Sequence, residues 1–364
     1  MSHLFSQRLA TWYATHARPL PWRDISDPYR IWISEIILQQ TRVAQGYDYY
    51  LRFVERFPDV ATLAAASEDE VLQQWEGLGY YSRARNLHAA AQQIVALGAF
   101  PTDYAGVRAL KGVGDYTAAA ICSFAFGLPT AVVDGNVYRV LARFFGIATP
   151  IDSTQGRREF SALAQSLLPR DAATHNQAIM DFGALQCTPK RPDCTACPLL
   201  DHCDAAATGR VAELPVKSKK TAVTERHFVY LLLATERNGR PHYFIRRREK
   251  GDIWAGLYEP LLIEFDQPPT DAQLLAHPLV AKLLSQGATL RPIASGLRHQ
   301  LTHRLLLTDA YLLRDLPEGI EEGEDLAEFR LVYEDELANY AFPRLVNLIF
   351  EKLPQPTDAP SLWD

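Results

Sequence analysis

The spacing of apolar residues divides the chain into two regions that predict different secondary structure. Before residue 210 the apolar positions recur at helical spacing and no strand pattern is present. The helices expected there include residues 4–17, 82–97, 116–126, 137–145, 154–168 and 173–186. After residue 224 the pattern becomes rich in β-branched and aromatic runs. The sequence therefore predicts an all-α domain over 1–208, a linker over 209–224 and an α+β domain over 225–353.

The second domain is expected to alternate strands with a few helices. The strands expected there are 227–234, 243–248, 257–265 and two or three within 291–313, and the helices are 271–285 and 343–353. Residues 354–364 contain proline and aspartate and are predicted to form a disordered tail.

Local signals mark several helix ends in the first region. Asp27-Pro28 is a helix start, with aspartate as N-cap and proline at the first position, and the helix is expected to run to about Val43. Ser67 and Glu70 form a capping box that opens another helix. Gly98 is expected to end the helix over 82–97.

The most informative stretch is 110–136, LKGVGDYTAAAICSFAFGLPTAVVDGN. Gly112 and Gly114 bracket one apolar residue before a helix of small residues, so their amides can approach an anion closely, aided by the helix dipole. Asp134 precedes the next helix, where amides and the dipole are expected to keep its carboxylate ionised. The alternative for each feature is structural, namely a connecting turn and a plain N-cap.

Four of the five cysteines fall within seventeen residues, in the spacing C-x6-C-x2-C-x5-C. In a chain without a secretory signal this favours a metal site over disulfides, with zinc as the default for four thiolates. The four are Cys187, Cys194, Cys197 and Cys203. The fifth, Cys122, lies in an apolar helix and is expected to be a buried core thiol.

The length, composition and charge of the chain constrain the number of domains, the location of the protein and its partners. The chain has 364 residues, enough for two domains, and contains no apolar run of membrane-spanning length or signal-peptide core, so we expect a cytoplasmic protein. The net charge is −6, but residues 1–226 carry +1 and residues 227–364 carry −7. The first region is therefore the candidate for nucleic-acid binding, with local patches supplying phosphate contacts.

The motifs LxGVG and VDGN resemble those of the helix-hairpin-helix DNA glycosylases. The cysteine spacing matches the iron–sulfur loop of the endonuclease III-like members, and this resemblance favours a structural 4Fe-4S cluster over zinc. It also implies that Lys190 and Arg191 face phosphate. The segments PWR, WxSExxLQQTRV, EGLGYYSRARNLH, LKGVGDYT and VDGNVYRV, within residues 19–204, together resemble adenine DNA glycosylases of the MutY type. That family removes adenine mispaired with 8-oxoguanine.

Glu35 is the expected general acid. It lies among apolar residues, and an apolar wall favours a neutral carboxyl; the alternative is a solvated glutamate on an amphipathic helix. The resemblance implies that Glu35 protonates N7 of adenine and then activates or guides the water. It also implies that Asp134 stabilises the oxocarbenium sugar, by its charge or as a transient nucleophile. Tyr116 would support the Asp134 side, and Asn136 would orient the water and Glu35.

Tyr116 stands where bifunctional members of the superfamily carry a nucleophilic lysine. The resemblance therefore implies a monofunctional enzyme that uses water and has no strong lyase activity. The DNA- or base-contacting positions that it implies are Trp22, Arg23, Gln40, Thr41, Tyr80, Gly112, Gly114, His299, Thr302 and His303. For Gln40 and the aromatic residues the alternatives are a solvent-facing side chain and core packing.

The second domain is expected to be Nudix-like and to recognise 8-oxoguanine opposite the adenine. No Nudix metal box follows Gly251 or Gly256, so neither Mg²⁺ nor pyrophosphatase activity is expected. The family's His-x-Phe-Ser-His loop reads here as residues 299–303, with Leu301 for phenylalanine and Thr302 for serine. A hydroxyl is kept and a stacking ring is lost, which puts the strength of 8-oxoguanine discrimination in question. The alternative is an edge strand with exposed polar residues.

The leading hypothesis is thus a mismatch adenine glycosylase of base-excision repair, acting as a monomer on duplex DNA with A:8-oxoguanine or A:G mispairs. One rival is an endonuclease III-like pyrimidine glycosylase with lyase activity, which Tyr116 and the second domain disfavour. The other is a non-catalytic iron–sulfur DNA-binding protein, in which Glu35 and Asp134 would be dispensable.

Overall fold

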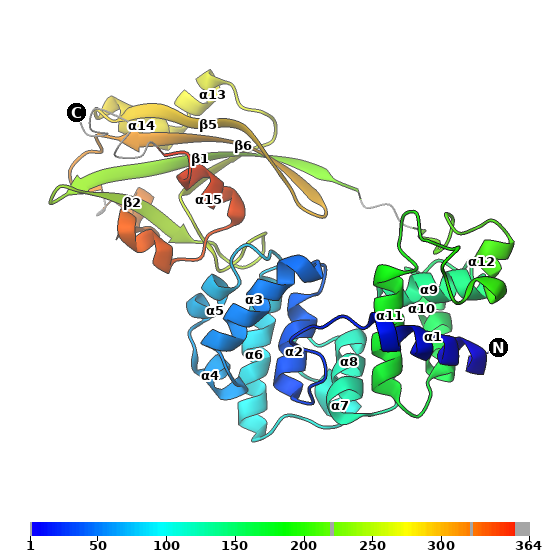
Figure 1. Ribbon diagram of the computed structural model, residues 1–364. Coiled ribbons are helices and arrows are strands. Elements are labelled where there is room, and N and C mark those ends of the chain that lie inside the picture. Colours follow the sequence, from blue (N-terminus) through cyan, green and yellow to red (C-terminus); the bar gives the residue numbers. More distant parts are fainter. Residues whose placement is uncertain (1, 219–221, 321–322, 354–364) are drawn as a thin grey trace. The chain divides into compact units, whose positions relative to one another are not determined.

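The computed structural model describes residues 2–218, 222–320 and 323–353, so the expected tail lies outside the described residues. The chain forms two compact units (Figure 1). The first comprises Met1–Ala66 with Asn86–Lys220, and the second comprises Ser67–Arg85 with Thr221–Asp364. The predicted fold class, a helical domain followed by an α+β domain, is confirmed.

The first unit is built from helices, and its described residues contain no strand. The helices are α1 (Ser2–His16), α2 (Pro28–Ile37), α3 (Val43–Arg56), α4 (Val60–Ala65), most of α6 (Ser82–Leu97), α7 (Tyr104–Arg108), α8 (Asp115–Phe126), α9 (Gly135–Phe145), α10 (Thr154–Leu167), α11 (Ala172–Leu185) and α12 (Asp204–Ala207), with the 3-10 turn η1 (Leu200–His202). Gly98, with φ +80°, follows α6 where its end was predicted.

The helix that opens at Asp27 is shorter than expected. Asp27 caps α2 by accepting from the amide of Tyr29 at 2.9 Å, as predicted, but the helix ends at Ile37. The prediction that it reaches Val43 is wrong, because Gln40 takes a left-handed φ of +58° that an α-helix cannot contain. Val43 instead begins α3.

The core of the first unit joins elements distant in sequence. Phe5 and Leu9 of α1 are fully buried in one cluster with Leu141 of α9, Phe160 of α10 and Phe182 of α11. Elsewhere α8 packs against α2. Its alanines are small enough to let another element approach closely, and Ala118 and Ala120 have no exposed surface.

The second unit is centred on a mixed sheet of order β3-β2-β1-β6-β5, in which β1 and β6 are parallel and β5 and β6 form an antiparallel hairpin. Its strands are β1 (Thr224–Arg237), β2 (Arg240–Arg247), β3 (Tyr258–Glu259), β4 (Leu261–Phe265), β5 (Thr289–Gln300), β6 (Arg304–Arg314) and β7 (Arg330–Tyr333). Its helices are α5 (Glu68–Gln74), α13 (Asp271–Leu275), α14 (Pro278–Ser285) and α15 (Arg344–Phe350), with 3-10 turns η3 (Glu324–Leu326) and η4 (Glu334–Asn339). The capping box of Ser67 and Glu70 at α5 is confirmed.

Three details of this unit differ from the prediction. The helix expected over 271–285 is two helices, because Pro278 starts a new one as its first residue. The strand expected over 257–265 is divided into β3 and β4 by Pro260. Strand β7 was not predicted. Among the described residues, no helix is long and apolar enough to cross a membrane.

Candidate active site and cysteine loop

Glu35 lies on α2 with only 7% of its surface exposed. The hydroxyl of Tyr116, at the start of α8, donates a hydrogen bond to its Oε2 at 2.6 Å. Burial, with a smaller contribution from Asp134, raises the pKa of Glu35 to about 7, although the Tyr116 bond and the charge of Arg23 act to lower it. The buried, protonatable carboxyl expected here is present, and it can be neutral near physiological pH.

The glycine turn before α8 sets the position of Tyr116. Gly112 has φ +75°, and a Cβ there would lie 2.6 Å from the Cβ of Asn86, so both conformation and space require glycine. Gly114 is the N-cap of α8. Burial raises the pKa of Tyr116 well above its ordinary value, as do Glu35 and Asp134, so its hydroxyl stays a proton donor.

Asp134 caps α9, as predicted. Its Oδ1 accepts from the amides of Asn136 and Val137, both at 2.8 Å. Burial nevertheless raises the pKa of Asp134, although these bonds and the charge of Arg139 favour the ionised form. The cap bonds favour the ionised form, as expected, but the sequence did not predict that burial would shift the pKa in the opposite direction.

Two hydrogen-bond pairings differ from those expected. Tyr116 donates to Glu35, whereas it was expected to support the Asp134 side. The side-chain amide of Asn136 donates to Oδ2 of Asp134 at 2.7 Å, whereas the expectation was that Asn136 orients the water and Glu35. Each carboxylate thus has its own neutral hydrogen-bond donor.

Arg139 of α9 links the Asp134 site to the start of the cysteine loop. Its Nη2 donates to Oδ1 of Asn136 at 2.8 Å and to the carbonyl of Gly183 at 2.6 Å, and its Nε donates to the carbonyl of Cys187 at 2.7 Å. This residue was not predicted, although a charged residue within an apolar helix is a signal for a buried polar network.

Trp22 is buried and Arg23 is half-buried. Trp22 is 6% exposed and its ring packs edge-on against Tyr50, with 5.0 Å between ring centroids. Arg23 donates to Oδ1 of Asp181 at 3.0 Å, and Arg18 binds the same oxygen. Asp181 is fully buried and was not predicted; its burial in α11 requires these two arginine partners.

Gln40 and Thr41 lie in the turn between α2 and α3. Gln40 is exposed in its left-handed conformation, and the Thr41 hydroxyl reaches the carbonyl of Gln39 at 3.4 Å. A non-glycine residue with positive φ costs energy and is common at functional sites. The structure therefore places Gln40 on the surface, in a turn of strained conformation.

Residues 299–303 form the end of β5 and the turn that leads to β6, at the edge of the sheet. Tyr80, in the second unit, has φ +49° and is 46% exposed, and its hydroxyl is hydrogen-bonded to that of Thr302. His299 is partly buried against Trp254, and His303 is exposed. The structure thus brings Tyr80 and Thr302 together.

The four cysteines of the loop line one small cavity, together with Arg143. All four are free thiols, and Arg143 donates to Sγ of Cys187 at 3.4 Å. Burial raises the pKa of Cys197 to about 11, and the neighbouring cysteines raise it too. The donor set suits a metal centre, but across the described residues no group of three His, Cys, Asp or Glu side chains is positioned to hold a single metal ion. Cys122 is fully buried, as predicted.

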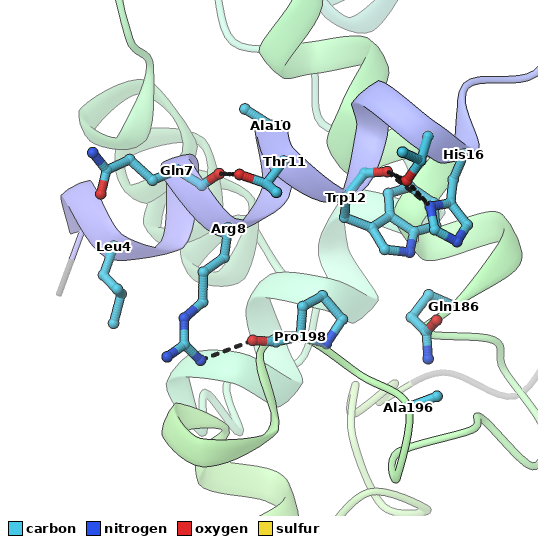
Figure 2. A pocket seen from close by; sticks show the side chains of 11 residues that line it. Leu4, Gln7, Arg8, Ala10, Thr11, Trp12, His16, Gln186, Ala196 and Pro198 are labelled. Carbon is cyan, nitrogen blue, oxygen red and sulfur yellow. Dashed lines mark hydrogen bonds between the residues drawn. The ribbon is translucent and has the colours of Figure 1, made fainter.

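A wide groove between α1 and the cysteine loop, of about 870 Å³, contains none of the predicted site residues (Figure 2). Trp12 and His16 stack at one end, with 4.6 Å between ring centroids, and Arg8 donates to the carbonyl of Pro198 at 2.8 Å (Figure 2). The Arg8 bond joins α1 to the cysteine loop across this groove.

Comparison with known proteins agrees with this architecture. The family model for the HhH-GPD superfamily of base excision DNA repair proteins matches residues 33–166, and a NUDIX domain model matches residues 229–352. A solved thermostable thymine-DNA glycosylase is 29% identical, with a TM-score of 0.53, and the match covers 57% of this chain and 97% of that one. An endonuclease III–DNA complex, 23% identical with a TM-score of 0.50, shares the fold over 57% of this chain and 95% of its own. The protein is therefore a helix-hairpin-helix DNA glycosylase.

Curated relatives narrow the family. The adenine DNA glycosylase of Buchnera aphidicola subsp. Baizongia pistaciae is 35% identical over 259 residues, which cover 70% of this chain and 72% of that protein. The human adenine DNA glycosylase is 43% identical over 213 residues, 55% of this chain and 39% of the human protein. The chain belongs to the adenine DNA glycosylase family of the MutY type, as its motifs predicted.

Proposed function

We propose that this enzyme removes adenine paired with 8-oxoguanine or guanine from duplex DNA, as a monofunctional glycosylase that acts as a monomer. The observation that carries the proposal is the buried Glu35 carboxyl, whose pKa of about 7 lets it hold a proton at neutral pH. Membership of the adenine DNA glycosylase family supports the choice of base. The adenine must leave the helix stack to reach such a buried group.

In the proposed reaction Glu35 donates its proton to N7 of the adenine. The bond between C1′ and N9 then breaks, and its electron pair leaves with the neutral base. The Asp134 carboxylate stabilises the positive charge that develops on the sugar. Water adds to C1′ and returns a proton to Glu35, which leaves an abasic site. Tyr116 has no amine with which to attack the sugar, so no Schiff base forms.

The remaining predicted residues are assigned to DNA. Gly112 and Gly114 present amides at the start of α8 to a phosphate, and Lys190 and Arg191 do so from the cysteine loop. Trp22 and Arg23 border the pocket for the flipped adenine. Gln40 and Thr41, in the turn after α2, are placed beside the opening left by that base.

We assign the 8-oxoguanine contact to His299, Thr302 and His303 of the second domain, residues 225–353, together with Tyr80 of the same compact unit. The paired hydroxyls of Tyr80 and Thr302 support this assignment, because a hydroxyl pair can both donate to and accept from the oxidised base. Domain 1–208 would carry the chemistry, and 209–224 would link the two.

We further propose that Cys187, Cys194, Cys197 and Cys203 hold a 4Fe-4S cluster. Four free thiols around one cavity support it. When bound, the cluster supplies a structural cross-link to the loop and takes no part in base release. Arg143, which is 3% exposed, holds the loop by donating to the carbonyls of Leu214, Thr188 and Pro189.

The test is a set of single-turnover assays with adenine opposite 8-oxoguanine, guanine or thymine. We expect strand breaks at adenine in the first two duplexes, and only after alkali. Breaks without alkali would assign lyase activity and contradict the role given to Tyr116. Equal release from the thymine duplex would contradict the mispair specificity.

A further inference from the structure

In the second unit, the carboxylate of Asp252 binds three arginines beside the sheet. Asp252, in the loop between β2 and β3, accepts at Oδ1 from Arg226 and from Arg304, both at 2.7 Å. Its Oδ2 accepts from Arg226 at 2.8 Å and from Arg248 at 2.9 Å. Asp252 thereby ties the starts of β1 and β6 to the residue that follows β2.

The three arginines depend on Asp252 to different degrees. Arg226 also pairs with Glu264 at 2.5 Å, and Arg248 also pairs with the buried Glu259. Burial acts to raise the pKa of Asp252, but hydrogen bonds from Arg226 and Arg304 outweigh it and hold that pKa below its usual range. The carboxylate therefore stays ionised, and its removal takes a charged partner from Arg304 while the other two arginines keep one each.

Arg304 closes the turn at residues 299–303. Its carbonyl accepts from the amide of Leu301 at 2.8 Å, and the carbonyl of the preceding residue, His303, accepts from the amide of Thr224 at 3.0 Å. A displacement of Arg304 therefore moves the end of this turn.

The loop between β2 and β3, which carries Asp252, also contacts the start of the turn at residues 299–303. The Trp254 ring lies edge-on to His299, with 5.8 Å between centroids. Trp254 has φ +60°, and its carbonyl accepts from the amide of Leu257 at 3.0 Å, which closes a tight turn within the loop. A bulky residue in this conformation is strained and persists only where its surroundings hold it.

We propose that Asp252 and Trp254 are positioning residues for specificity: by holding Arg304 and His299, they set the shape in which the turn at 299–303 meets the base opposite the adenine. This rests on the function proposed above for that turn. Since Leu301 offers no ring to stack on the base, the turn depends on its hydroxyl and imidazole groups, whose placement must be more exact.

The test uses Asp252→Asn in the full-length holoenzyme. Glu264→Gln is the matched control, because it also removes one negative charge that pairs with Arg226, but Glu264 does not bond to Arg304. Single-turnover adenine release is measured opposite 8-oxoguanine and opposite guanine, and thermal unfolding is recorded for each variant. We expect Asp252→Asn to lower the ratio of the two rates by about fivefold, as a lost charge-assisted hydrogen bond allows. The A:G rate and the control ratio should stay unchanged, a split that general destabilisation would not produce.

Arg304→Gln removes the other partner of the Arg304–Asp252 contact. If Asp252→Asn does not fold, the rate ratio of Arg304→Gln tests the proposal in its place. The double variant should lose no more discrimination than either single one, because both remove one contact. Thr302→Ala distinguishes the function proposed for the turn at 299–303 from the positioning role proposed for Asp252 and Trp254. A lower ratio for Thr302→Ala with an unchanged ratio for the Asp252 and Arg304 variants would overturn this inference alone. An unchanged ratio for Thr302→Ala would overturn the function proposed for the turn.

Discussion

The hydroxyl of Tyr116 donates to Oε2 of Glu35 across 2.6 Å, from the first turn of α8 to the last turn of α2. Tyr116 is thus a neutral donor that favours the ionised form of Glu35, the carboxyl that we propose as the general acid. The bond opposes the effect of burial on Glu35 and so keeps its pKa near neutrality. In the mechanism that we propose, this pair sets the proton affinity of the catalytic acid.

Replacement of Tyr116 by phenylalanine should raise the pKa of Glu35, because the bond that lowers it is lost. In a profile of single-turnover rate against pH, the limb assigned to Glu35 should move to higher pH. The maximal rate should fall about tenfold, since a charge-assisted hydrogen bond contributes about 1.5 kcal/mol. Tyr138→Phe on α9 is the matched control, because that ring packs against Phe160. A profile for Tyr116→Phe that does not move would contradict the coupling.

The same carboxyl should destabilise the folded protein at high pH. Burial raises the pKa of Glu35 from 4.5 to about 7, so the folded state holds the proton more tightly than the unfolded chain does. Stability contributed by this group is therefore present below pH 4.5 and is lost as pH rises through about 7. Glu35→Gln should be more stable than the wild type at pH 8, by up to about 3 kcal/mol, and nearly equal to it at pH 4.5.

Urea unfolding at the two pH values measures this difference, with the exposed Glu159→Gln on α10 as control. If Glu35→Gln increases the free energy of unfolding equally at both pH values, the increase does not come from ionisation of Glu35.

Loss of one cysteine from the loop should remove the metal centre. Cys194→Ser is expected to purify without iron or acid-labile sulfide and with a less stable segment over 187–203, because four thiolates are required to bind the cluster. Cys122→Ala, which alters a buried thiol outside the loop, should keep both. Zinc in the wild-type protein in place of iron would contradict the assignment.

Much of this architecture follows from local sequence signals. Asp27, Ser67 and Asp134 act as helix caps as predicted, because capping depends on residues within one turn. The end of α2 could not be predicted, since the left-handed Gln40 breaks a segment whose apolar spacing continues. Strand β7 is short, and its pairing with β2 is a long-range contact.

The site was predicted in its residue types and only partly in its contacts. Glu35, Tyr116, Asp134 and Asn136 follow from motifs, but which donor meets which carboxylate depends on how α2, α8 and α9 pack. Arg139 and Asp181 were missed for the same reason, because their partners are far away in the sequence. Asp134 also shows that a cap visible in the sequence does not determine a pKa, since burial is a tertiary property.

The most direct test of the account is adenine release by Glu35→Gln from an A:8-oxoguanine duplex under single-turnover conditions, with DNA affinity measured alongside. Glutamine keeps the shape of the side chain and can accept the Tyr116 bond, but its amide has no acidic proton to transfer to N7. We predict that release falls by at least about a hundredfold, the lower end for loss of general acid catalysis, while the duplex still binds. Full release with unchanged binding would contradict the assignment of Glu35 as the catalytic acid.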